Sequence, residues 1–262
     1  MTDYSKPNRT ILGPMAPPIS EVMSPSSVEK MREKLIVALD VANAKAARET
    51  VQRLGEAAGI YKIGLQLFTA EGPAIVREMV ASGRRVFLDL KLHDIPNTVA
   101  HAVKSAAELG PSMITVHASG GLAMLQAAVE ASSGRTKVLA VTVLTSFSEQ
   151  DLQQTGVPDS VSEQVLRLAS LARTAGCAGV VSSARETAQL RKFLGEGFDI
   201  VNPGVRPAGT DTHDQQRTAT PSEAICAGAS HIVVGRPITH ASNPVLAVEA
   251  IVAEMANARI RT

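Results

Sequence analysis

The fold is decided by the stretch RVFLDLKLHDIPNTVAHAVKSAAELGPSMITVHAS, residues 85–119. It contains an apolar run at 85–92, an alanine-rich segment at 96–109 that suits a helix, and a second apolar run at 113–119. Continuous apolar strands that are covered by helices are typical of a parallel sheet. The stretch therefore predicts one strand–helix–strand unit of an α/β protein.

The same alternation extends from this stretch toward both ends of the chain. Further runs rich in Val, Ile and Leu give eight strand candidates in all, at 35–41, 60–68, 85–92, 113–119, 137–145, 179–184, 198–204 and 231–237. The helix candidates between them include 96–109, 122–132, 162–175 and 243–257. Eight such pairs predict a single-domain (β/α)8 TIM barrel. An open doubly wound sheet is the alternative, but VANAK follows Asp40 where a glycine-rich dinucleotide loop would be expected.

The composition indicates how the domain is bounded and which classes of partner are disfavoured. Five prolines interrupt residues 1–30, which predicts a flexible N-terminal tail, with the barrel catalytic domain over residues 31–262. The net charge of +1 and the absence of Trp argue against nucleic acid and membrane surfaces as partners. Two cysteines and the lack of a secretory or transmembrane segment predict a cytoplasmic protein.

Charged residues interrupt the predicted strands near their C-terminal ends. Asp89 and Lys91 are two apart and so project to the same side of their strand. Lys62 interrupts IYKIGLQLF, and Asp40 ends LIVALD. Each has an ordinary structural reading: an ion pair, a lysine whose amine reaches solvent, and a helix cap. Because active sites of this fold lie at the C-terminal ends of the strands, the four charges together predict a catalytic site.

The last two strands predict a phosphate site. Gly235 and Arg236 follow the apolar run IVV, and in this fold the loops after strands seven and eight often bind phosphate. An arginine packed at the barrel rim is the alternative reading. The polar stretch 202–224 is too long for a routine connection, which predicts a lid or binding loop with Arg206 and Gln215 as candidate ligand contacts.

The segment DLKLHDIPNTV, residues 89–99, resembles the Asp-x-Lys-x-x-Asp signature of the orotidine 5′-phosphate decarboxylase family. YKIGLQLF, VHASGG, PGVRP and VVGRPI resemble bacterial members too, in the expected order from about Leu35 to the C-terminus. The resemblance implies decarboxylation of orotidine 5′-monophosphate to UMP, the last step of de novo pyrimidine biosynthesis. It also implies catalysis without a cofactor or metal, in a homodimer.

The resemblance further implies roles for individual residues. Lys91 would stabilise the carbanion at C6 of the pyrimidine and then protonate it, within a charge array that includes Lys62, Asp89 and Asp94. Asp94 and Thr98 would reach into the partner subunit's site, so the dimer would share its active sites. The implied substrate contacts are Asp40, Lys62, Thr98, Thr145, Arg206, Gln215, Gly235 and Arg236.

Three other functions fit the same barrel. The 3-keto-gulonate 6-phosphate decarboxylase resembles this chain in Asp-x-Lys-x-x-Asp and works through Mg²⁺, but it carries an acidic residue at the position of Lys62. An aldolase or isomerase would use Lys91 as a Schiff base. A phosphometabolite sensor would bind UMP without turnover. No His or Cys spacing predicts a zinc site, whereas metal binding through Asp89 and Asp94 stays open.

Overall fold

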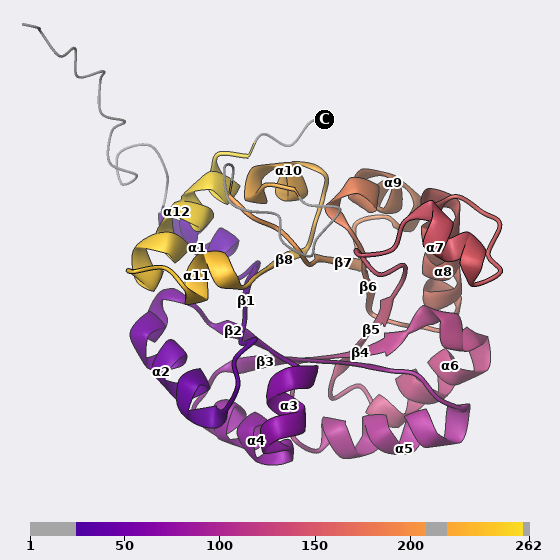
Figure 1. The fold of residues 1–262 in the computed structure, drawn as a ribbon, viewed down its shortest axis with the longest axis horizontal. Coiled ribbons are helices and arrows are strands. Elements are labelled where there is room, and N and C mark those ends of the chain that lie inside the picture. Colours follow the sequence, from indigo (N-terminus) through magenta and orange to yellow (C-terminus); the bar gives the residue numbers. More distant parts are fainter. Residues whose placement is uncertain (1–24, 208–218, 259–262) are drawn as a thin grey trace, which may run out of the picture.

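The computed structural model describes residues 25–207 and 219–258. Its strands are parallel and pair in chain order, and the last pairs with the first to close a barrel (Figure 1). The strands are β1 Leu35–Ala38, β2 Ile60–Gly64, β3 Arg85–Leu92, β4 Met113–His117, β5 Lys137–Val141, β6 Gly179–Val181, β7 Asp199–Asn202 and β8 His231–Val234. This arrangement confirms the predicted (β/α)8 barrel.

Helices form a layer around the outside of the barrel (Figure 1). They are α1 Pro25–Arg32, α2 Ala44–Leu54, α3 Leu65–Glu71, α4 Pro73–Ala81, α5 Pro96–Ala107, α6 Gly121–Ser132, α7 Glu149–Gln154, α8 Val161–Thr174, α9 Ala184–Leu194, α10 Pro221–Cys226, α11 Arg236–Thr239 and α12 Pro244–Ala256, with 3₁₀ turns η2 Gly55–Ala57 and η3 Ala118–Gly120. Within residues 25–207 and 219–258, none of these helices has the length and hydropathy that crossing a membrane requires.

The barrel has an inner and an outer apolar core because side chains alternate along each strand. Ile60 and Phe87 belong to the inner core, which fills the barrel, whereas Leu88 packs outward against the helices. The next inward positions on the same two strands are Lys62 and Asp89. Two charged side chains therefore follow the apolar layers at the C-terminal end of the barrel interior.

Several predicted boundaries were wrong. The strands predicted at 113–119, 179–184 and 231–237 end earlier, at His117, Val181 and Val234. Residues 65–68 were predicted to continue β2, but the strand ends at Gly64 and these residues begin α3. A short apolar run does not by itself distinguish a strand from a buried helix. Residues 25–30 were predicted to belong to the tail, but they are helical, because a proline is tolerated at the first position of a helix. Residues 1–24 lie outside the described part of the chain.

Candidate active site

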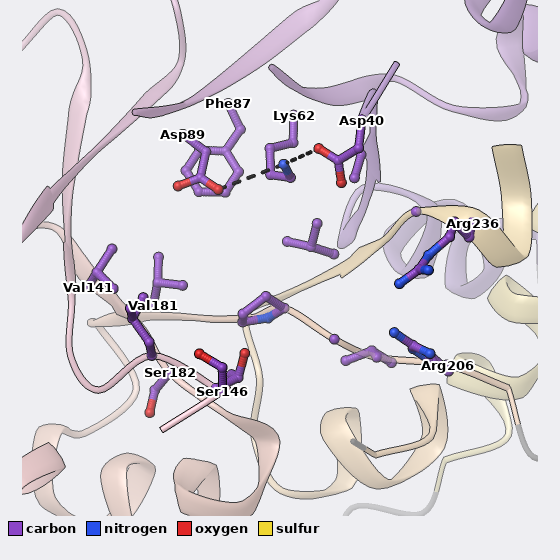
Figure 2. A pocket seen from close by; sticks show the side chains of 18 of the residues that line it. Asp40, Lys62, Phe87, Asp89, Val141, Ser146, Val181, Ser182, Arg206 and Arg236 are labelled. Carbon is purple, nitrogen blue, oxygen red and sulfur yellow. Dashed lines mark hydrogen bonds and ion pairs between the residues drawn. The ribbon is translucent and has the colours of Figure 1, made fainter. Parts of the chain in front are cut away.

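A cavity of about 590 Å³ opens at the C-terminal ends of the strands (Figure 2). Its walls come from residues that lie in or directly after every strand except β4. Phe87, Val141, Val181 and Val233 of the inner core form its apolar floor. The predicted site residues that line it are Asp40, Lys62, Asp89, Lys91, Thr145, Arg206, Gly235 and Arg236.

Four charged side chains form a continuous chain of ion pairs on one wall, which we call the charge chain: Asp40, Lys62, Asp89 and Lys91. Lys62 Nζ lies 2.8 Å from Asp40 Oδ1 and 3.8 Å from Asp89 Oδ2. Lys91 Nζ donates to the same Asp89 oxygen at 2.7 Å. The Lys62 and Asp89 side chains are only 12% and 10% exposed. Alternating signs make this burial tolerable, since an isolated buried ion would cost several kcal/mol.

Asp40, the first member of the charge chain, does not cap a helix. Asp40 follows β1, and its side chain is 58% exposed at the cavity rim. The cap of α2 is Asn43, whose Oδ1 accepts a hydrogen bond from Ala46 N. The capping role that the sequence suggests for Asp40 is thus filled by another residue, and Asp40 Oδ1 instead accepts a hydrogen bond from Lys62 Nζ (Figure 2).

The sequence did not predict a role for Thr115, a fully buried residue of β4 that forms hydrogen bonds with two members of the charge chain. Its hydroxyl donates to Asp89 Oδ1 at 2.9 Å and accepts from the backbone N–H of Lys91 at 2.8 Å. The register of β3 against β4 shifts between Leu88 and Leu92, and Lys91 has a positive φ of 51° within this bulge. A β-branched residue in the apolar run MITVHAS is ordinary for a strand, so the sequence carries no signal for this contact.

Asp94 and Thr98 do not join the charge chain of their own subunit. Both are exposed and lie outside the cavity lining, and Asp94 Oδ1 accepts a hydrogen bond from Ile95 N at 2.6 Å. Within one chain, the predicted group of Lys62, Asp89, Lys91 and Asp94 is therefore only three-quarters assembled. Asp94 and Thr98 lie in and just before the first turn of α5, where both are exposed. Their contact with a partner subunit stays a prediction.

The phosphate-binding prediction rests on residues at another side of the cavity. Arg206 follows β7 and Arg236 begins α11, and their guanidinium groups converge into the cavity from the side opposite Asp89 (Figure 2). Gly235 and Thr145 also line the cavity. Gln215 lies outside the described residues. Two converging guanidinium groups suit a dianion, because each presents several donors in a fixed plane.

A histidine pair lies beside the lysine end of the charge chain. The rings of His93 and His117 have centroids 5.5 Å apart. Burial lowers the pKa of His117, and the nearby His93 and Lys91 lower it further, against a smaller opposing effect of Asp89. The environment of His117 thus favours its neutral form beside the Lys91 ammonium.

A metal would need a cluster of ligands. Among residues 25–207 and 219–258, no three His, Cys, Asp or Glu side chains are gathered closely enough to form one. The carboxylates of Asp40 and Asp89 are instead bridged by the ammonium of Lys62.

Fold and cavity together define a (β/α)8-barrel enzyme with a charged site at the C-terminal rim of the barrel. The chain belongs to the orotidine 5′-phosphate decarboxylase / HUMPS family, whose sequence model matches residues 33–251. That match spans the whole barrel from before β1 into α12.

Similar proteins carry the same family name. Orotidine 5′-phosphate decarboxylase of Moorella thermoacetica is 51% identical over 233 residues, which cover 86% of this chain and 92% of that protein. Orotidine 5′-phosphate decarboxylase of Syntrophotalea carbinolica is also 51% identical, over 235 residues. The crystal structure of orotidine 5′-phosphate decarboxylase from Lactobacillus acidophilus has a TM-score of 0.76 at 40% identity, over 84% of this chain and 98% of that one.

Proposed function

We propose that this protein decarboxylates orotidine 5′-monophosphate to UMP in pyrimidine biosynthesis. The observation that carries the proposal is the charge chain of Asp40, Lys62, Asp89 and Lys91 on the wall of a cavity with an apolar floor. The relatives of about 50% identity, which are named for this activity, support it.

The chemistry accounts for the placement of a lysine in the cavity. When the bond between C6 and the carboxylate breaks, CO₂ leaves and an electron pair stays in an orbital of C6 that the ring π system does not delocalise. Lys91 supplies a preorganised positive charge for that pair and then transfers a proton from Nζ to C6. Water returns a proton to the neutral amine after UMP leaves.

Asp89 has two roles in this proposal. It accepts a hydrogen bond from Lys91 Nζ and so holds the ammonium in place. Its position in the cavity lining would bring it near the departing carboxylate of the substrate. Lys62 and Asp40 bind the ribose hydroxyls from the neighbouring strands. Because the cavity floor is apolar, these electrostatic interactions are stronger than they would be in water.

The substrate is oriented by contacts far from C6. Arg206, Arg236 and the backbone N–H of Gly235 bind the phosphate, and Thr145 contacts the pyrimidine amide. The family resemblance implies that Gln215, which lies outside the described residues, bridges base and phosphate. Binding energy from the phosphate then contributes to the transition state, since it holds the ring against Lys91.

The active form in this proposal is a cytoplasmic homodimer. Asp94 and Thr98 contact the site of the partner subunit, and their exposure in the single chain supports this. Ile95 between them is 66% exposed, and a partner subunit at this position would cover it. Free thiols at Cys177 and Cys226 fit a reducing compartment.

A Mg²⁺-dependent lyase of the same family is the second candidate. It would need carboxylates that are available to a metal. Here the Lys62 ammonium lies 2.8 Å from Asp40 and 3.8 Å from Asp89, where it would repel a divalent cation. This arrangement favours the decarboxylation of the nucleotide.

An absorbance assay tests the proposal with purified protein and orotidine 5′-monophosphate, with and without EDTA. We expect conversion to UMP at the same rate in both. Loss of turnover in EDTA with recovery in Mg²⁺ would favour the metal-dependent lyase, and UMP binding without any turnover would favour a sensor. Inactivation by borohydride in the presence of substrate would indicate a Schiff base on Lys91.

A further inference from the structure

Thr115 contacts two members of the charge chain with one hydroxyl group. Oγ1 donates to Asp89 Oδ1 at 2.9 Å and accepts from Lys91 N at 2.8 Å, which uses the donor and an acceptor position of the hydroxyl. The side chain is completely buried, and it lies behind Asp89 rather than on the cavity wall. No water therefore competes for either bond.

The backbone around Lys91 needs such a contact. From Leu88 to Leu92 the β3 strand advances four residues, whereas its partners on β4, Ile114 and Val116, are only two apart. The extra residues form a bulge in which Lys91 has φ 51°, a conformation that costs a residue with a side chain roughly 1–2 kcal/mol. Within this bulge, the N–H of Lys91 is satisfied by the Thr115 hydroxyl.

We propose that Thr115 is the positioning residue for the Asp89–Lys91 pair. Its hydroxyl fixes the direction in which the Lys91 side chain leaves the backbone, and at the same time it fixes the rotation of the Asp89 carboxylate. The distance of 2.7 Å between Lys91 Nζ and Asp89 Oδ2 follows from both constraints. This inference rests on the proposed function, because its effect is exerted on the step at C6.

Removing the hydroxyl separates this role from simple packing. Thr115→Val keeps the β-branched shape but loses both hydrogen bonds. We expect kcat for orotidine 5′-monophosphate to fall about 10- to 100-fold, as for displaced catalytic groups, with KM and the Kd for UMP within about threefold of wild type. Thr115→Ser, which restores the hydroxyl, should keep kcat within about threefold.

Thr136 provides the matched control. It is also a buried threonine, and its Oγ1 donates to Pro111 O at 2.7 Å. Thr136 directly precedes β5 and so lies at the N-terminal end of the strand, whereas the cavity lies at the C-terminal ends. Thr136→Val therefore removes a buried threonine hydrogen bond outside the cavity, and we expect kcat to stay near the wild-type value.

The outcomes are distinguishable. If wild type itself does not decarboxylate the nucleotide, the proposed function fails. If wild type is active and Thr115→Val matches it, or if Thr115→Ser is as slow as Thr115→Val, the positioning role is overturned. Where Thr115→Val does not yield folded protein, Thr115→Ala and Thr115→Ser are compared instead, since they differ only by the hydroxyl. An equal kcat for these two also overturns the proposal.

Discussion

Gly64 and Lys62 are so close that a Cβ atom on Gly64 would lie 2.8 Å from Lys62 Nζ. The same Cβ would lie 3.4 Å from Asp40 Oδ1. The ion pair between Lys62 and Asp40 thus occupies the space that the missing side chain leaves. Gly64 is also the last residue of β2, so the absence of a side chain at the end of this strand leaves room for the Lys62 ammonium.

We expect Gly64→Ala to displace the Lys62 ammonium without unfolding the barrel, because the atom that must move is the end of a flexible side chain. If Lys62 binds the ribose, kcat/KM for orotidine 5′-monophosphate should fall about 10-fold or more, in line with the loss of a charged hydrogen bond. Gly59→Ala is the control, since its Cβ would meet nothing within 4 Å. An unchanged kcat/KM in Gly64→Ala would exclude this role of Lys62.

The converging guanidinium groups predict a dependence on the substrate phosphate. Arg236→Ala should lower kcat/KM for orotidine 5′-monophosphate about 100-fold, because a charged, planar donor is lost. It should barely change kcat/KM for orotidine, which has no phosphate. The comparison requires both substrates with each variant. Arg48→Ala, which breaks an exposed ion pair with Glu78, is the control. Equal losses on both substrates would place Arg236 in a general structural role.

Shared active sites predict recovery of activity on mixing. Lys91→Ala should remove nearly all turnover, because the charge and the proton donor at C6 are lost. Asp94→Asn should also be inactive, because the site of the partner subunit loses the Asp94 carboxylate. A mixed dimer then contains one site with both native residues. We expect mixing after subunit exchange to restore up to about a quarter of the wild-type sites, by the statistics of two shared sites per dimer. Exchange without recovery means that Asp94 serves only its own chain.

The opposite end of the barrel predicts a pH dependence of stability. Burial lowers the pKa of His231; Asp199 opposes this effect and the positive charges of Lys137, Arg85 and Lys34 add to it, so that the pKa falls to about 4. The unfolded chain, with a pKa near 6.5, binds the proton more readily. The stability from neutral His231 is therefore complete above pH 6.5 and is lost as the pH falls toward 4.

Denaturant unfolding at pH 7 and pH 5 measures this effect. We expect His231 to account for a loss of about 2 kcal/mol in the free energy of unfolding between these pH values. His231→Phe should lose correspondingly less than wild type over the same range, whereas His101→Gln, at an exposed position of α5, should behave like wild type. Equal pH dependence in His231→Phe and wild type would contradict the assignment.

The barrel and most of the charge chain could be predicted because both depend on simple periodicity. Charged residues within apolar strands are conspicuous, so Lys62, Asp89 and Lys91 are visible in the sequence. The bulge at Lys91 is not, because no glycine or asparagine marks its positive φ. The role of Thr115 could not be predicted for a related reason. Its hydroxyl joins β4 to β3, and the sequence does not show the register of these two strands.

Helix boundaries beside the site were harder to predict. The run IYKIGLQLF crosses from β2 into α3 without a polar segment that would mark the change. Gly64 is both the last residue of β2 and the N-cap of α3, whereas the strand was predicted to continue to Phe68. Tertiary packing decides such short segments more than local preference does.

The pairing of β8 with β1 has a consequence for biosynthesis of the protein. Asp40 and Arg236 contribute to one cavity although nearly two hundred positions separate them, and the wall between them exists only when β8 has docked. While β8 and Arg236 are still inside the ribosome during synthesis, the nascent chain has no complete cavity. Chains that end before β8 are consequently expected to lack turnover, so that activity reports on molecules whose last strand is paired with the first.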